Sequence, residues 1–208
     1  MAAWVLALCA CEPFYSYRNS YVDDFATPNP VPDNFFTCYG YGCKYRTRIS
    51  LASAEWRSVR GYFDPPPADA HAERRQIAKA VAQMELLVSE RTGTHVHQRR
   101  GFNGGDATQL DCIDESINTY TYMTMFERDG LLRYHRVGGL AFGGTLWDFD
   151  VRNTAVLVAS ATDERYAIDP TRVDSGVPPP VFPLSLWKGD WPPEIPDEYW
   201  RDDLPDAF

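Results

Sequence analysis

The sequence of 208 residues has no run of about 20 apolar residues, the length that a membrane-spanning helix needs. It is also short of positive charge: 20 Lys and Arg stand against 29 Asp and Glu, a net charge of −9. An acidic chain repels phosphate backbones, so we expect no nucleic-acid partner. Neither Gly138-Gly139 nor Gly143-Gly144 is followed by Lys and Ser or Thr, which excludes a nucleotide-binding phosphate loop.

The composition instead fits a folded domain, because 44% of the residues are hydrophobic and 14% are aromatic. We predict an α+β fold in which a central helix carrying Cys112 packs on a small antiparallel sheet. The domain is expected to span residues 45–170. A Pro-rich N-terminal arm over 12–44 and a Pro- and Trp-rich C-terminal arm over 171–208 are expected to pack on it.

Local patterns predict three helices and four strands. Apolar residues at helical spacing and a following Gly93 predict a helix over 68–91. A second helix, 110–128, is expected to end at Asp129-Gly130, and a third is expected to run to about Tyr62 with Ser50 as its N-cap. The strands are predicted at Tyr45–Ile49, Leu131–Val137, Asn153–Ala159 and Arg165–Ile168, the last two as a hairpin.

Residues 2–11 are uncharged and apolar, a pattern typical of an export signal, although no Lys or Arg precedes them. The sequence L-C-A-C resembles a bacterial lipobox, with Leu8 at −3, Ala10 at −1 and Cys11 as the lipid-modified residue. The resemblance implies a lipoprotein signal over 1–11 and a membrane-associated or secreted periplasmic protein. The alternative is that this segment is a buried first strand or helix.

Cys38 and Cys43 flank two glycines that allow the chain to turn back, which favours a disulfide in an oxidising compartment. Half of a metal site is the alternative, but no second pair of ligands lies nearby in the sequence. If Cys9 and Cys11 belong to the signal, Cys112 is left as the odd cysteine, either reactive or buried and inert.

The chemistry is expected at Cys112, where a glycine-rich loop leads into a helix. Free N–H groups and the positive end of the dipole favour a thiolate there. The backbone N–H of Cys112 and the Gln109 side chain could stabilise an oxyanion. Asp111, Asp114 and Glu115 oppose this, because nearby carboxylates raise a thiol pKa.

The segment G-G-D-A-T-Q-L-D-C-I-D-E-S-I-N-T and the later R-N-T-A-V-L-V-A-S-A-T-D-E-R-Y-A-I-D-P resemble the transglutaminase-like form of the papain-like fold. The resemblance covers about residues 104–170. It implies that Cys112 is the nucleophile and that Asp169 orients an imidazole. The family His falls at Arg152 or Asn153, so this chain departs from the pattern. His135 is the one histidine after Cys112.

These observations give two expected functions for an exported bacterial cell-envelope protein. The first is a cysteine hydrolase or acyltransferase acting on a peptide, peptidoglycan or protein amide. In it Cys112 attacks, His135 is the base, Asp169 orients it and Gln109 helps to hold the oxyanion. The second is an inactive lipoprotein that binds a partner or supports structure. Cys112 could also be a small buried apolar residue in a protein that never used it for catalysis. No cofactor is expected, and the oligomeric state is not predicted.

Overall fold

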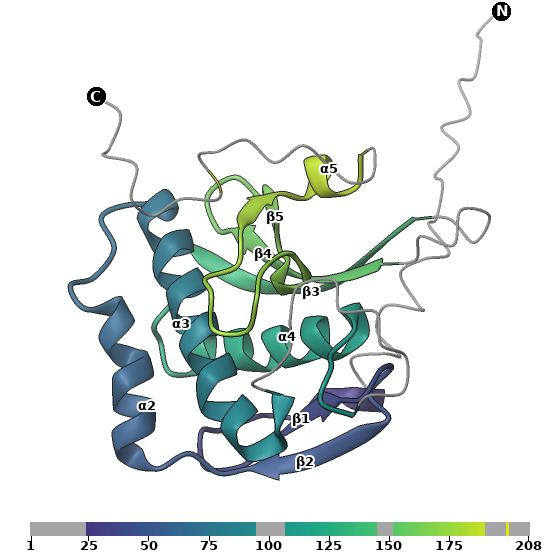
Figure 1. Cartoon of the computed structure of the whole chain (residues 1–208). Helices are drawn as coiled ribbons and strands as arrows, with labels where there is room; N and C mark the ends of the chain where they lie inside the picture. The colour runs from purple at the N-terminus through teal and green to yellow at the C-terminus, as the bar shows by residue number, and fades with distance from the viewer. Residues whose placement is uncertain (1–23, 95–106, 145–151, 190–198, 200–208) are drawn as a thin grey trace, which may run out of the picture.

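The computed structural model describes residues 24–94, 107–144, 152–189 and 199. It has the predicted α+β class, with two antiparallel sheets ordered β1-β2 and β3-β4-β5-β6. Helix α4 lies between the two sheets, and α2 and α3 flank it on one side (Figure 1). The elements are β1 Phe35–Tyr39, β2 Tyr45–Ile49, α2 Ser53–Arg60, the 3-10 helix η1 Gly61–Phe63, α3 Ala70–Thr92, α4 Cys112–Arg128, β3 His135–Gly143, β4 Arg152–Ala159, β5 Arg165–Ile168, the 3-10 helix η3 Pro170–Arg172, β6 Val181–Pro183 and α5 Leu184–Trp187.

Helix α3 forms as its sequence pattern predicts. The Asp69 side chain accepts a hydrogen bond from the Ala72 N–H at 2.7 Å, and Gly93 ends the helix at φ +77°, where a residue without a Cβ is favoured. The four apolar residues of its stripe are all buried: Ile77, Val81, Met84 and Val88.

Helix α2 begins later than predicted. Its N-cap is Ala52 rather than Ser50, and the Glu55 side chain accepts the Ala52 N–H at 2.8 Å. Glu55 thus satisfies the N–H of the N-cap residue, and Ala52 supplies no side-chain cap to the N–H groups of the first turn.

Strand β3 begins and ends later than the predicted Leu131–Val137, since it runs from His135 to Gly143. Its register against β4 shifts between Val137 and Leu140, which marks a bulge. Gly139 has φ +83° there, and a Cβ on Gly138 would lie 2.6 Å from Val158. The glycine pair therefore allows the strand to bend.

Both predicted arms contribute strands. β1 lies inside the range expected for the N-terminal arm, and β6, inside the C-terminal one, pairs with β5 as the edge of the larger sheet. The expected lipoprotein signal with Cys11 lies outside the described residues. No helix in the described ranges is both long and apolar enough to span a bilayer.

Candidate functional site

Helix α4 starts at Cys112 because the carboxylate of Asp111 caps it. Asp111 Oδ1 accepts the N–H groups of Ile113 and Asp114 at 3.0 and 2.9 Å. The Asp114 side chain in turn accepts the Asp111 N–H, which completes a capping box. These acidic residues therefore act first as helix-start groups.

The same two carboxylates hold the turn that joins β1 to β2. Residues 40–43 all have positive φ, and Cys38 and Cys43 form the predicted disulfide across the turn. Three successive N–H groups point at α4: those of Tyr41 and Cys43 donate to Asp114, and that of Gly42 donates to Asp111. A concave run of backbone N–H groups is a natural anion site, and here the protein's own carboxylates occupy it.

Asn118, one helical turn beyond Asp114, also joins α4 to β1. Its Oδ1 accepts the Cys38 N–H at 2.7 Å, and its Nδ2 donates to the Cys38 carbonyl at 2.9 Å. The side chain thus satisfies the free edge of β1 in place of a neighbouring strand. No local pattern in the sequence singles out Asn118.

Cys112 lies where α4 meets the ends of β4 and β5. The Asn153 backbone N–H donates to its sulfur, and Glu115 and Asp169 are close enough to influence its ionisation. Asp169 is thus near enough to influence the thiol, and Asn153, at the position where the resembled family has histidine, contacts it through its backbone.

The electrostatics of this site oppose a thiolate. Burial, followed by the Asp111 carboxylate, raises the pKa of Cys112 to about 12, although the Asn153 N–H lowers it in part. Burial and the Asp169, Asp114 and Asp111 carboxylates also raise the pKa of Glu115 well above its ordinary value. At neutral pH the sulfur is therefore a neutral thiol, which is a poor nucleophile.

Arg152 and Asn153 stand where the resembled family has its histidine, and of the two Asn153 shares a face with Cys112. Side chains alternate along a strand, and Ala155 and Leu157 of β4 pack in the main core with α4. Val156 packs on the opposite face with Trp187. The Arg152 side chain lies on that second face, where its Nη2 donates to the Trp187 backbone carbonyl at 3.0 Å.

Asp169 follows β5 and is 2% exposed. Its Oδ2 accepts from Trp187 Nε1 and from Arg172 Nε, both at 3.1 Å. The Thr171 hydroxyl donates to its other oxygen. In a catalytic triad the acid would hold an imidazole, whereas this carboxylate is held by the C-terminal segment.

The structure does not bring His135 to Cys112. His135 pairs with Ala159 at one end of β4, and Asn153 lies at the other end, opposite Phe142. Six residues of strand span about 20 Å. His71 is on α3, and the remaining two histidines, His95 and His97, lie outside the described residues.

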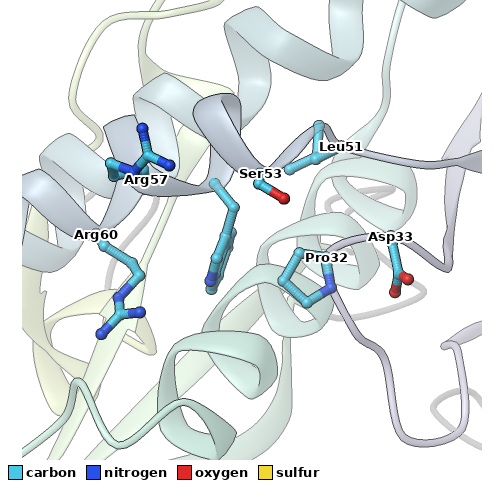
Figure 2. A pocket seen from close by; sticks show the side chains of 7 residues that line it. Pro32, Asp33, Leu51, Ser53, Arg57 and Arg60 are labelled. Atoms are coloured by element: carbon cyan, nitrogen blue, oxygen red, sulfur yellow. The ribbon is translucent and has the colours of Figure 1, made fainter.

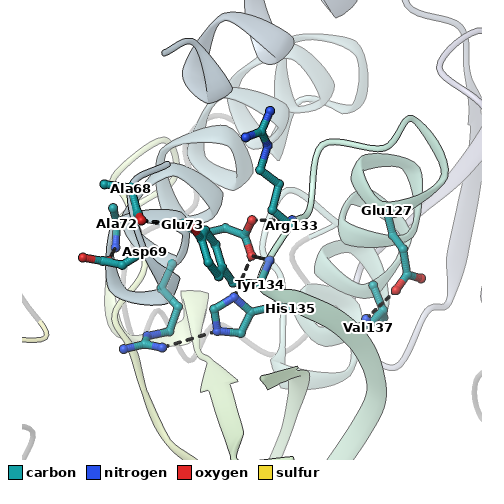
Figure 3. Close-up of polar contacts among 10 residues, drawn as sticks. Ala68, Asp69, Ala72, Glu73, Glu127, Arg133, Tyr134, His135 and Val137 are labelled. Atoms are coloured by element: carbon teal, nitrogen blue, oxygen red, sulfur yellow. Dashed lines mark hydrogen bonds and ion pairs between the residues drawn. The ribbon is translucent and has the colours of Figure 1, made fainter. Parts of the chain in front are cut away.

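His135 belongs to a separate buried cluster with α3 (Figure 3). Its Nδ1 lies 2.7 Å from Glu73 Oε2, and its Nε2 lies 3.3 Å from Arg74 Nη1. Because arginine only donates, Nε2 accepts, and the proton sits on Nδ1 facing Glu73. Glu73 also accepts the Tyr134 N–H at 2.9 Å. This cluster fastens the start of β3 to α3.

The oxyanion donors expected beside Cys112 are only partly arranged for that role. Gln109 is buried, and its backbone carbonyl accepts the Gly40 N–H at 3.3 Å, which joins the segment before α4 to the disulfide turn. The next two helix N–H groups already donate to Asp111. Within the described ranges, no three His, Cys, Asp or Glu side chains are grouped to hold a metal ion.

An open hollow lies elsewhere, beside the start of α2 (Figure 2). Trp56, one of the residues that line it, donates to Asp129 at 3.0 Å, and Arg60 pairs with the same carboxylate at 3.4 Å. Its charges are therefore partly compensated. The lining residues are Pro32, Asp33, Leu51, Ser53, Trp56, Arg57 and Arg60.

Comparison with known proteins gives no relative: no protein-family model, curated protein or solved structure matches this chain.

Proposed function

We propose that this chain is an exported cell-envelope protein that keeps a transglutaminase-like arrangement without catalysis, as a binding or structural module. The observation that carries the proposal is Asn153 beside Cys112, where the resembled family has its histidine. An amide cannot accept the thiol proton at neutral pH, so the pair lacks a general base.

The charges around the sulfur support the same proposal. A catalytic cysteine needs cationic or hydrogen-bonding neighbours that favour the thiolate. Cys112 instead has Asp111, Glu115 and Asp169 nearby, and its pKa is raised to about 12. The acid that would orient a base, Asp169, is engaged by Trp187 and Arg172.

The disulfide supports the export part of the proposal, because such bonds persist mainly in oxidising compartments. The lipobox-like Leu8 and Cys11 supply the proposed anchor.

The competing function is a cysteine hydrolase or acyltransferase acting on an amide. The proximity of Cys112 to Asp169 favours it, because these residues match two members of the family triad. It would require an imidazole at the sulfur, and His135 lies at the other end of β4.

The rate of Cys112 alkylation by iodoacetamide against pH tests the proposal. The full chain is used, modification is located by peptide mass spectrometry, and Cys112→Ser provides the blank for Cys9 and Cys11. We expect Cys112 to react slowly, with a midpoint well above the value of about 8.5 for a free thiol. A midpoint well below that value would show an activated nucleophile and contradict the proposal.

Two variants sharpen this experiment. Asn153→His places an imidazole beside the sulfur, so we expect faster alkylation at pH 7 and a lower midpoint. His135→Ala is the matched control, and we expect it to leave the Cys112 midpoint unchanged. If the Cys112 midpoint rises in His135→Ala, His135 assists the ionisation of Cys112, and the result supports the hydrolase hypothesis.

A further inference from the structure

The β1–β2 hairpin carries a row of cations on its outward face. Arg46 and Arg48 alternate with Tyr45 and Thr47 in β2, so their side chains share one side of the strand, and Lys44 directly precedes the strand at the same spacing. All three are exposed. The inward face packs through Phe35 and Ile49 in the main core.

No carboxylate neutralises this row within the described part of the chain. The residues opposite Arg48 and Arg46 on β1 are Phe36 and Cys38, which carry no charge. The contacts of the cations are with aromatic rings: Lys44 Nζ lies 5.2 Å from the Tyr45 centroid, and the Arg46 guanidinium lies 5.0 Å from that of Phe36. Many other arginines, such as Arg60, Arg91 and Arg136, pair with acids.

An exposed aromatic ring accompanies the cations. Phe36 is 37% exposed on the face that carries Arg46 and Arg48. Tyr45, which is 41% exposed, follows the other face of the strand, and its ring lies beside Lys44. Cations beside partly exposed rings suit a bilayer interface, where the rings enter the headgroup region and the cations meet lipid phosphates. A soluble polyanion without rings, such as polyphosphate, would use the cations but gain nothing from Phe36.

We propose that this face of the hairpin docks on the surface of an anionic phospholipid bilayer. The hairpin is rigid enough for this role, because the Cys38–Cys43 disulfide and the backbone bonds to α4 hold its turn. The net charge of −9 does not prevent docking, since charges more than about 8 Å away are largely screened at physiological salt. This surface would hold the folded domain against the bilayer, whereas the lipid proposed at Cys11 would anchor the chain through its N-terminal segment.

The docking surface rests on the proposed envelope location but not on the state of Cys112, and the test separates the two. The full chain, purified without lipidation, is sedimented with vesicles of phosphatidylglycerol and phosphatidylethanolamine, or of phosphatidylcholine alone. We expect at least tenfold stronger partitioning into the anionic vesicles, falling as salt is raised.

The matched variants carry the same change in net charge. Lys44→Gln, Arg46→Gln and Arg48→Gln together should lower partitioning into anionic vesicles about tenfold or more. The control replaces three exposed cations elsewhere, Arg57, Arg165 and Lys188, with Gln and should bind as the parent does. Phe36→Ser should weaken vesicle binding without changing binding to soluble polyphosphate.

Equal loss in both triple variants would show an effect of net charge alone and overturn the proposal. Binding to polyphosphate without binding to vesicles would assign the face to a soluble polyanion and would also overturn it. Either result would leave the Cys112 alkylation experiment, and hence the non-catalytic proposal, unaffected.

Discussion

Glu73 and His135 form a buried pair whose role is structural, although His135 alone looks like a catalytic candidate in the sequence. Both side chains are fully buried, and their contact of 2.7 Å joins α3 to the start of β3. The sequence favours a catalytic role for His135 because it is the one histidine after Cys112. It gives no sign of a partner for His135 in Glu73, although Glu73 lies four residues before Ile77 and therefore on the buried face of α3.

At this scale we predict that Glu73→Ala lowers the free energy of unfolding by about 3–5 kcal/mol. The change leaves His135 and the Tyr134 N–H without their buried acceptor. Urea denaturation measures the loss. Glu90→Ala, at an exposed site on the same helix, should change stability by less than about 0.5 kcal/mol. Similar values for the two variants would refute a structural role for the pair.

At the scale of elements, the start of α4 and the disulfide turn stabilise each other. The turn needs acceptors for three N–H groups, and α4 needs an N-terminal cap. The carboxylates of Asp111 and Asp114 meet both needs. Burial and the neighbouring Asp111 raise the pKa of Asp114 to about 7. This carboxyl therefore binds a proton more readily in the folded protein than in the unfolded chain.

This shift predicts a pH dependence of stability. Between about pH 4 and pH 7 the folded state holds more protons at Asp114 than the unfolded state, so stability should fall as pH rises across that range. Asp114→Asn should flatten part of the decline, leaving the part due to Glu115. Thermal melts at intervals across this range measure the slope. Glu90→Gln should retain the parent slope; equal flattening there would contradict the assignment.

The disulfide makes a second prediction for these elements. Replacing Cys38 and Cys43 with Ser should lower stability by about 2 kcal/mol, because a six-residue loop is no longer closed in the unfolded chain. Urea denaturation of the oxidised parent and of the variant gives the difference. Reductant should reduce the stability of the parent and leave the double variant unchanged. If reductant lowers the stability of the parent and of the double variant equally, the loss does not come from the Cys38–Cys43 disulfide.

For the whole molecule, the C-terminal segment is part of the domain. β6 completes the larger sheet, and Trp187 is fully buried between Asp169, which accepts its Nε1–H, and Arg152. The C-terminal segment therefore holds Asp169 and Arg152, which lie next to the candidate site, and is part of the folded domain.

We therefore predict that Trp187→Ala costs about 3–5 kcal/mol, since it leaves a cavity and removes a partner of Asp169. Leu186→Ala, on the exposed side of the same short helix, should cost less than about 0.5 kcal/mol. Chemical denaturation of both variants provides the comparison. A mild effect of Trp187→Ala would mean that the segment is dispensable to the fold.

The sequence by itself determined the α+β class, the spans of α3 and α4, the β4–β5 hairpin and the Cys38–Cys43 disulfide. Each depends on a local signal: apolar spacing, a cap, a turn or two cysteines near in sequence. Tertiary structure alone decided that β1 and β6 belong to the sheets, that Asn118 joins β1 to α4, and that Glu73 joins the start of β3 to α3. It also decided that Asn153 rather than His135 lies at Cys112. Those outcomes depend on strand register and on contacts between distant segments, which no local pattern of residues encodes.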